Sequence, residues 1–125
     1  MKVLIVADES LSALRLADDV EQCGHRVLGP VPSTGAGLLL ARNEKPQAAI
    51  IDLDMRFTAD GLDLARVLHA MAVPCIVATG NAQMANAATD VATAIVCKPL
   101  ATDEVSAAIR AASAANARRL AQAVS

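Results

Sequence analysis

Several apolar runs of the chain end in side chains that carry a charge or a hydroxyl group. These residues are Asp8, Glu9, Asp52, Asp54, Thr79 and Lys98. Carboxylates brought together offer the oxygen ligands that Mg²⁺ prefers, and one carboxylate oxygen can attack phosphorus as a nucleophile. A hydroxyl group and an ammonium group can then hold the transferred phosphoryl oxygens. The residue types therefore predict phosphoryl chemistry, with a purely structural ion pair between Lys98 and the acids as the simpler alternative.

The short apolar runs are predicted to be β-strands, because turn residues bound them. The predicted strands span residues 3–7, 26–29, 48–53, 74–79 and 93–97. Helices are expected over residues 10–24, from 33 or 34 to 42, and over 61–71, 81–88 and 102 onward, with Ser10 and Thr102 as caps. This alternation predicts an α/β domain with a doubly wound, five-stranded parallel sheet and helices on both faces. The carboxyl ends of its strands meet at one edge, where we expect the six polar residues to gather.

The length and composition of the chain fit one globular domain without a surface for nucleic acid or lipid. The 125 residues, 54% of them hydrophobic, can bury a core, and we expect a single domain over residues 1–125. Phe57 is the one aromatic residue, which excludes a base-stacking platform for single-stranded nucleic acid. The formal net charge of −2 provides no basic surface for nucleic acid or anionic lipid.

Neither export nor a membrane span is indicated by the sequence. The first apolar run is too short for a signal peptide, and two acidic residues follow it at once. Residues 67–89 contain no Asp, Glu, Lys or Arg, but Pro74 and Gly80 interrupt them, so we expect a buried strand with flanking turns. The three cysteines lack metal-like spacing and are expected to be small buried residues in a reducing cytoplasm: Cys23, Cys75 and Cys97.

Five segments of the sequence resemble the receiver domains of two-component response regulators. They are VLIVADES, AIIDLDM, DGLDLA, IVATGN and VCKPL, and they stand in the family's order over nearly the whole chain. The resemblance implies the flavodoxin-like receiver fold. Since the residues after Lys98 suffice for one long helix, we expect no output domain within residues 1–125.

The resemblance also implies a role for each acidic residue. Asp52 is the implied phosphoacceptor, and Asp8 is the implied direct ligand of Mg²⁺. Asp54 is implied to offer its backbone carbonyl to the metal. The side chain of Asp54 and the residue Asn81 lie where receivers tune their rate of dephosphorylation.

The remaining motif residues are implied to act on the phosphoryl group. Thr79 and Lys98 would contact it, and Gly80 would leave room for the phosphodonor. The peptide bond before Pro99 resembles one that is cis in the family, which an X–Pro bond permits at modest cost.

The sequence departs from the family pattern at several points, including Arg56 in a loop one residue longer than the commonest form and a short segment between Thr79 and Lys98. Two further departures concern the residues expected to bind the metal and to switch. Ala7 stands where receivers usually carry the first of two acids, and Glu9 is expected to compensate in part as an indirect metal contact. Ile95 stands where receivers usually carry an aromatic switch residue. Any switching is therefore expected to pass through Thr79, the short helix over residues 81–88 and the loop after Asp52.

A cytoplasmic signalling protein, not an enzyme, is the function that the resemblance implies. A histidine kinase or a histidine phosphotransfer protein would donate the phosphoryl group, and the receiver would assist its own phosphorylation and dephosphorylation. The added charge would change contacts with an unidentified protein partner. The last helix is long enough to offer a homodimer interface.

Two alternatives remain open from the sequence. The first is a degenerate receiver that acts as an interaction module without phosphorylation, which Ala7 and Ile95 favour. The second is a phosphatase of the haloacid-dehalogenase-like class, which also places an Asp-x-Asp pair after an apolar strand. Against it, Asp8 has no role there and no later apolar run ends in paired acids.

Overall fold

The five predicted strands form one parallel sheet in the computed structural model, which describes residues 1–55 and 58–124. The strands are β1 (Lys2–Val6), β2 (Arg26–Val31), β3 (Ala48–Asp52), β4 (Cys75–Thr79) and β5 (Ala94–Cys97). Their order across the sheet is β2-β1-β3-β4-β5, and each neighbouring pair is parallel. The predicted doubly wound fold is therefore confirmed, and the carboxyl ends of β1, β3 and β4 lie side by side.

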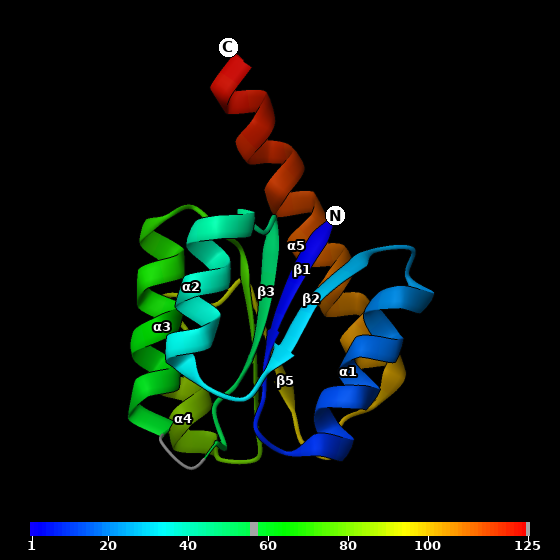
Figure 1. Cartoon of the computed structure of the whole chain (residues 1–125), viewed down its shortest axis with the longest axis vertical. Coiled ribbons are helices and arrows are strands. Elements are labelled where there is room, and N and C mark those ends of the chain that lie inside the picture. Colours follow the sequence, from blue (N-terminus) through cyan, green and yellow to red (C-terminus); the bar gives the residue numbers. More distant parts are fainter. Residues whose placement is uncertain (56–57, 125) are drawn as a thin grey trace.

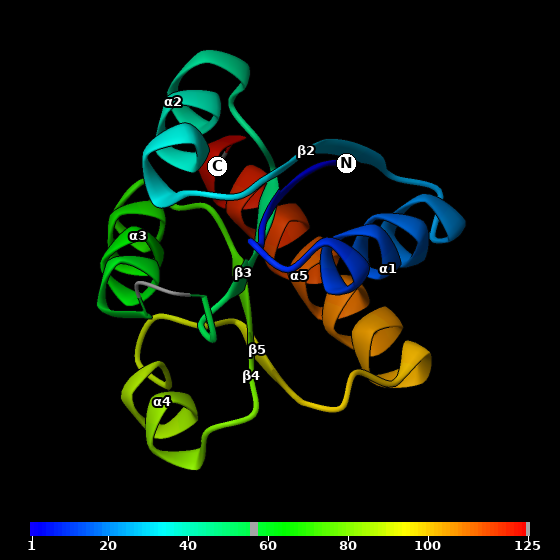
Figure 2. The same ribbon diagram turned by 60° about the horizontal axis from the view of Figure 1, so that its bottom comes forward.

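Five helices cover the two faces of the sheet (Figure 1). They are α1 (Ser10–Gln22), α2 (Thr34–Glu44), α3 (Thr58–Ala70), α4 (Ala82–Ala87) and α5 (Thr102–Val124). Figure 2 shows α1 and α5 on one side of the sheet and α2, α3 and α4 on the other. The far end of α5 projects beyond the amino edge of the sheet (Figure 1).

Side chains that alternate along the strands divide the core into two clusters, because successive residues of a strand point to opposite faces. On β1, Leu4 and Val6 belong to the cluster under α2 and α3, whereas Val3 and Ile5 belong to the cluster under α1 and α5. All four are at most 1% exposed. The strands that carry the polar residues are thus fixed from both faces.

A glycine allows α2 to lie close against the sheet. A Cβ atom on Gly37 would sit 2.8 Å from Cγ2 of Val6 and 3.2 Å from Cδ2 of Leu64. Gly37 lowers the intrinsic helix propensity of this segment, but the close approach of α2 to β1 requires it.

Several elements have boundaries that differ from those predicted, among them α1, β2 and α3. Glu9, not Ser10, caps α1, because its carboxylate reaches the free N–H groups of the first turn. β2 continues through Pro30. An edge strand tolerates proline, which has no N–H, because no strand pairs with its outer side. α3 begins at Thr58 instead of Gly61. Phe57 lies outside the described residues.

The expectation for the cysteines is correct for one of the three. Cys75 is fully buried on β4, and burial raises the pKa of its thiol to about 12. Cys23 is half-buried, and Cys97 is exposed because the edge strand β5 turns it outward. None of the described helices combines the length and apolar character needed to cross a membrane.

Candidate functional site

Three of the predicted polar residues stand at the ends of neighbouring strands. Asp52 is the last residue of β3, Thr79 is the last residue of β4, and Lys98 directly follows β5. Backbone hydrogen bonds extend the ladder past these ends: Leu53 N–H donates to Ala78 O at 2.8 Å, and Lys98 N–H donates to Thr79 O at 3.0 Å. The backbone positions of the three residues are therefore set by the sheet.

The carboxylate of Asp52 is the most deeply buried charged group of this edge, at 2% exposure. Its Oδ1 accepts hydrogen bonds from the Asp54 N–H at 2.8 Å and from the Lys98 ammonium at 3.0 Å. The same ammonium lies 2.9 Å from Oδ2. Partial burial alone would lower the pKa of Lys98, but the hydrogen bond and charge of Asp52, with a contribution from Asp54, raise it above its usual value. Lys98 is thus a permanent cation beside a buried carboxylate.

A second carboxylate, that of Asp54, points at the end of β4. The Thr79 hydroxyl donates to Asp54 Oδ1 at 2.7 Å, and the Gly80 N–H donates to Oδ2 at 2.7 Å. The Lys98 ammonium lies 3.3 Å from the same Oδ2. Thr79 is oriented in turn by the Asn81 N–H, which donates to its Oγ1 at 3.1 Å. From the sequence, the backbone carbonyl of Asp54 was predicted to bind the metal. The Gly80 N–H was not predicted as a hydrogen-bond donor to the Asp54 side chain.

Hydrogen bonding keeps Asp54 ionised. Burial alone would raise the pKa of this carboxyl, but the hydrogen bonds from Thr79 and Gly80, with the charge of Lys98, hold the pKa below its usual value. Because ionised acceptors form stronger hydrogen bonds than neutral ones, the Asp54 contacts are charge-assisted.

The segment after β1 offers fewer carboxylate ligands than the usual pair of acids, because Ala7 takes the place of one of them. Val6 pairs with Ile51, so Ala7 stands level with Asp52, is only 4% exposed and has no ligand atom on its side chain. Asp8 follows and is exposed. Within residues 1–55 and 58–124, no three acidic, His or Cys side chains gather as a metal site.

The donors that remain fit Mg²⁺ rather than a metal that needs a full protein cage. Mg²⁺ commonly takes one or two carboxylates and keeps several water ligands. The side chains of Asp8 and Asp52 and the backbone carbonyl of Asp54 are the groups that would hold the ion. The Asp54 carboxylate itself faces Thr79 and Gly80.

Glu9 is committed to the start of α1. Its Oε1 accepts from the Leu11 N–H at 3.0 Å and its Oε2 accepts from the Ser12 N–H at 2.7 Å. Those backbone hydrogen bonds lower the pKa of Glu9 below its usual value. Any contribution of Glu9 to a metal site would therefore have to pass through water or compete with this cap.

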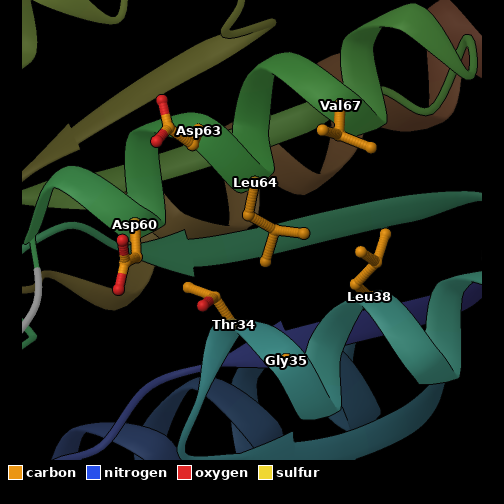
Figure 3. Close-up of a pocket in the computed structure, with 7 residues that line it drawn as sticks. All are labelled: Thr34, Gly35, Leu38, Asp60, Asp63, Leu64 and Val67. Carbon is orange, nitrogen blue, oxygen red and sulfur yellow. The ribbon is translucent and has the colours of Figure 1, made fainter.

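Two hollows of the surface lie apart from this cluster. One, of about 210 Å³, opens between α2 and α3 and is lined by Thr34, Gly35, Leu38, Asp60, Asp63, Leu64 and Val67 (Figure 3). The other, of about 360 Å³, lies between β5 and α5 beside Ile95, the position of the missing aromatic residue. Both lack the four residues Asp52, Asp54, Thr79 and Lys98. The cluster, and not a deep cavity, is the candidate site.

The peptide bond between Lys98 and Pro99 is cis, as expected. α4 is short, as expected, and spans six residues that begin after the capping Asn81. The cis peptide bond directly follows Lys98, and the Asn81 cap of α4 lies two residues after Thr79.

Comparisons with known proteins bear on the family and the fold of the chain. Residues 3–110 match the family model for the response regulator receiver domain. The signal receiver domain of a modulated diguanylate cyclase from Desulfovibrio desulfuricans is 27% identical, with a TM-score of 0.82 over 94% of this chain and 97% of that one. The response regulator PhyR from Brucella abortus is 29% identical, with a TM-score of 0.78 over 89% of this chain and 46% of that one.

A third structure shows the same fold at lower identity. The CheY-like receiver domain protein from Methanospirillum hungatei is 20% identical, with a TM-score of 0.81 over 94% of this chain and 97% of that one. No curated protein matches the chain.

Proposed function

Because the chain belongs to the response regulator receiver domain family, we propose that it accepts a phosphoryl group on Asp52 in two-component signalling. Receiver domains are generally signalling domains, and the match to the receiver family favours this function over the phosphatase alternative. The observation that carries the proposal is the buried Asp52 carboxylate held by the Lys98 ammonium at 2.9 and 3.0 Å. A degenerate receiver would not need to keep both partners.

The chemistry follows from the charges around Asp52. A carboxylate oxygen of Asp52 attacks the phosphorus of a phosphohistidine, an O–P bond forms, and the P–N bond breaks with its electron pair left on the imidazole nitrogen. Lys98 offsets the negative charge of the transferred group, and the Thr79 hydroxyl and Gly80 N–H are placed to bind its oxygens. When bound, Mg²⁺ would supply charge neutralisation between Asp8, Asp52 and the phosphoryl oxygens.

A histidine kinase or histidine phosphotransfer protein fits the surface next to Lys98. Leu11 and Leu14 of α1 are 77% and 62% exposed and lie three residues apart, on one side of the helix. Leu11 also lines a hollow of about 260 Å³ that reaches Lys98 and Pro99. An apolar helix face beside the reactive carboxylate suits a helical partner that carries the phosphohistidine.

Intact-protein mass spectrometry tests the proposal. The protein is incubated with Mg²⁺ and acetyl phosphate, and the expected result is one added phosphoryl group in the wild type and none in Asp52→Asn. Asp63→Asn is the matched control, because Asp63 is an exposed carboxylate of α3 paired with Arg66. Absence of an adduct with acetyl phosphate and with a cognate kinase would instead support the degenerate receiver.

A further inference from the structure

We propose that the Asp54 side chain is an internal competitor for the phosphoryl-binding groups and must leave them before Asp52 is phosphorylated. The inference rests on the proposed function of Asp52. It assigns the Asp54 carboxylate a role in the unphosphorylated protein, separate from that of the Asp54 backbone carbonyl, which would bind Mg²⁺. The role is exerted on the forward reaction, before any phosphoryl group is present.

The contacts of Asp54 are those that a phosphoryl group on Asp52 would need. Its Oδ1 accepts from the Thr79 hydroxyl and its Oδ2 from the Gly80 N–H, each at 2.7 Å, and Oδ2 also lies 3.3 Å from the Lys98 ammonium. The same ammonium contacts Asp52 Oδ2 at 2.9 Å. An anion therefore already occupies the donors that surround the nucleophile.

The donors cannot serve both anions at once. The hydroxyl of Thr79 and the N–H of Gly80 each have one hydrogen to give, and both are given to Asp54. A phosphoryl group on Asp52 would bring a charge of about −1.5 to −2 next to the ionised Asp54 carboxylate. Charge repulsion and the loss of the shared donors would expel Asp54 from this place.

Asp54 can leave without disturbing the core. Its side chain is 31% exposed, whereas that of Asp52 is 3% exposed. A Cβ atom on Gly80 would lie 3.5 Å from Asp54 Oδ2, so the carboxylate rests against a glycine. A rotation of the Asp54 side chain toward solvent breaks its three polar contacts with Thr79, Gly80 and Lys98. The loss of these contacts opposes phosphorylation of Asp52.

Removal of the competing carboxylate is the test. Asp54→Ala deletes both oxygens and keeps the backbone carbonyl, and Asp54→Asn keeps the size of the side chain without its charge. Asp63→Ala serves as the control for loss of an exposed carboxylate. Phosphorylation by acetyl phosphate is followed by mass spectrometry at an Mg²⁺ concentration that saturates each variant. Binding of beryllium fluoride, an unreactive phosphoryl mimic, is titrated separately by NMR.

Asp54→Ala is expected to be phosphorylated about tenfold faster than the wild type and to bind beryllium fluoride about tenfold more tightly. The reason is that the variant frees the hydrogen-bond donors of Thr79 and Gly80, which the Asp54 carboxylate occupies in the wild type. Asp54→Asn is expected to shift both quantities in the same direction, and Asp63→Ala to leave both unchanged. Beryllium fluoride in the wild type should also free the Gly80 N–H from Asp54, seen as a shift of its amide resonance.

Each other outcome decides against the proposal. Equal rates and equal affinities in the wild type and both Asp54 variants would overturn the competitor role and leave phosphorylation of Asp52 standing. Slower phosphorylation with weaker beryllium fluoride binding in folded Asp54 variants would show that the carboxylate assists the reaction. If no variant and no wild type takes up a phosphoryl group, the proposed function itself fails.

Discussion

The centre of the sheet and its β5 edge are built differently. Every residue of β3 and β4 is buried, so Asp52 and Thr79 stand at the ends of two rigid strands. β5 has one buried residue among four, and none of the six residues of α4 is buried, all of them within the described part of the chain. The reacting carboxylate thus ends a fully buried strand, while the neighbouring region that would transmit a change is more exposed to solvent.

The difference in burial between the centre of the sheet and the β5 edge bears on the role of Ile95. Ile95 lies half-buried on β5, beside the hollow of about 360 Å³ that Glu104 and several alanines of α5 complete. An aromatic side chain there would move a large volume when the site changes, and an isoleucine moves a smaller one.

A pair of matched isoleucine truncations should show the contrast most strongly. Ile51→Ala in β3 removes a fully buried side chain, and we expect the free energy of unfolding to fall by about 2–5 kcal/mol. Ile95→Ala removes a half-buried one, and we expect a loss of about 1 kcal/mol or less. Urea unfolding followed by circular dichroism measures both. Equal losses would show that β5 is packed as tightly as β3.

Truncation of Lys98 should break the link between the two regions. Lys98→Ala leaves the buried Asp52 carboxylate without its cation, and we expect a loss of about 1–3 kcal/mol in unfolding free energy. The variant should still accept a phosphoryl group on Asp52, but amide NMR shifts along β5 on phosphorylation should be smaller than in the wild type. Identical shifts in both proteins would show that the signal reaches β5 by another route.

The Asp54 contacts predict a pH dependence with a definite sign. Because the folded pKa of Asp54 lies below its usual value of 3.8, the contacts stabilise the fold above that pH and are lost as the pH falls through the folded pKa. Wild type should exceed Asp54→Asn in unfolding free energy by at most about 1 kcal/mol at pH 6, after discounting for solvent screening. The difference should shrink as the pH falls below 3.8 and through the folded pKa of Asp54. A difference that stays constant over this range would assign the stabilisation to another group.

Restoring an aromatic residue at the β5 edge should have the smallest effect on stability. Ile95→Phe places a larger side chain next to the hollow between β5 and α5, and we expect a change within about 1 kcal/mol of the wild type. Phosphorylation should be unaffected, while the phosphorylation-dependent shifts of α5 amides should grow. If these shifts do not change, the aromatic position carries no readout in this protein.

The fold was predictable because hydrophobic runs and helical spacing alternate regularly, and the carboxyl edge of a parallel sheet gathers whatever polar residues end its strands. The element ends were harder. The cap of α1 is the longer Glu9 side chain and not Ser10, and β2 runs through Pro30 because it lies at an edge. The local sequence determines neither which strand lies at the edge of the sheet nor which side chain reaches the free N–H groups of a helix.

The limits of sequence reasoning are clearest at Asp54. The Asp-x-Asp spacing fixes the backbone of Asp54 beside Asp52, but its side-chain direction depends on Thr79 and Gly80 from a strand more than twenty residues away. Likewise, Cys97 belongs to an apolar run and is nevertheless exposed, because β5 turned out to be the outer strand. Tertiary contacts decide both cases.

Localisation of the phosphoryl group tests the central claim most directly. Borohydride reduces an aspartyl phosphate to homoserine, so treatment of the phosphorylated protein followed by peptide sequencing in the mass spectrometer marks the acceptor residue. Asp52 and Asp54 fall on one peptide, and fragment ions distinguish them. We predict homoserine at position 52 and unmodified aspartates at positions 8 and 54. Homoserine at position 54 or 8, with Asp52 unmodified, would contradict the assignment of Asp52 as the phosphoacceptor.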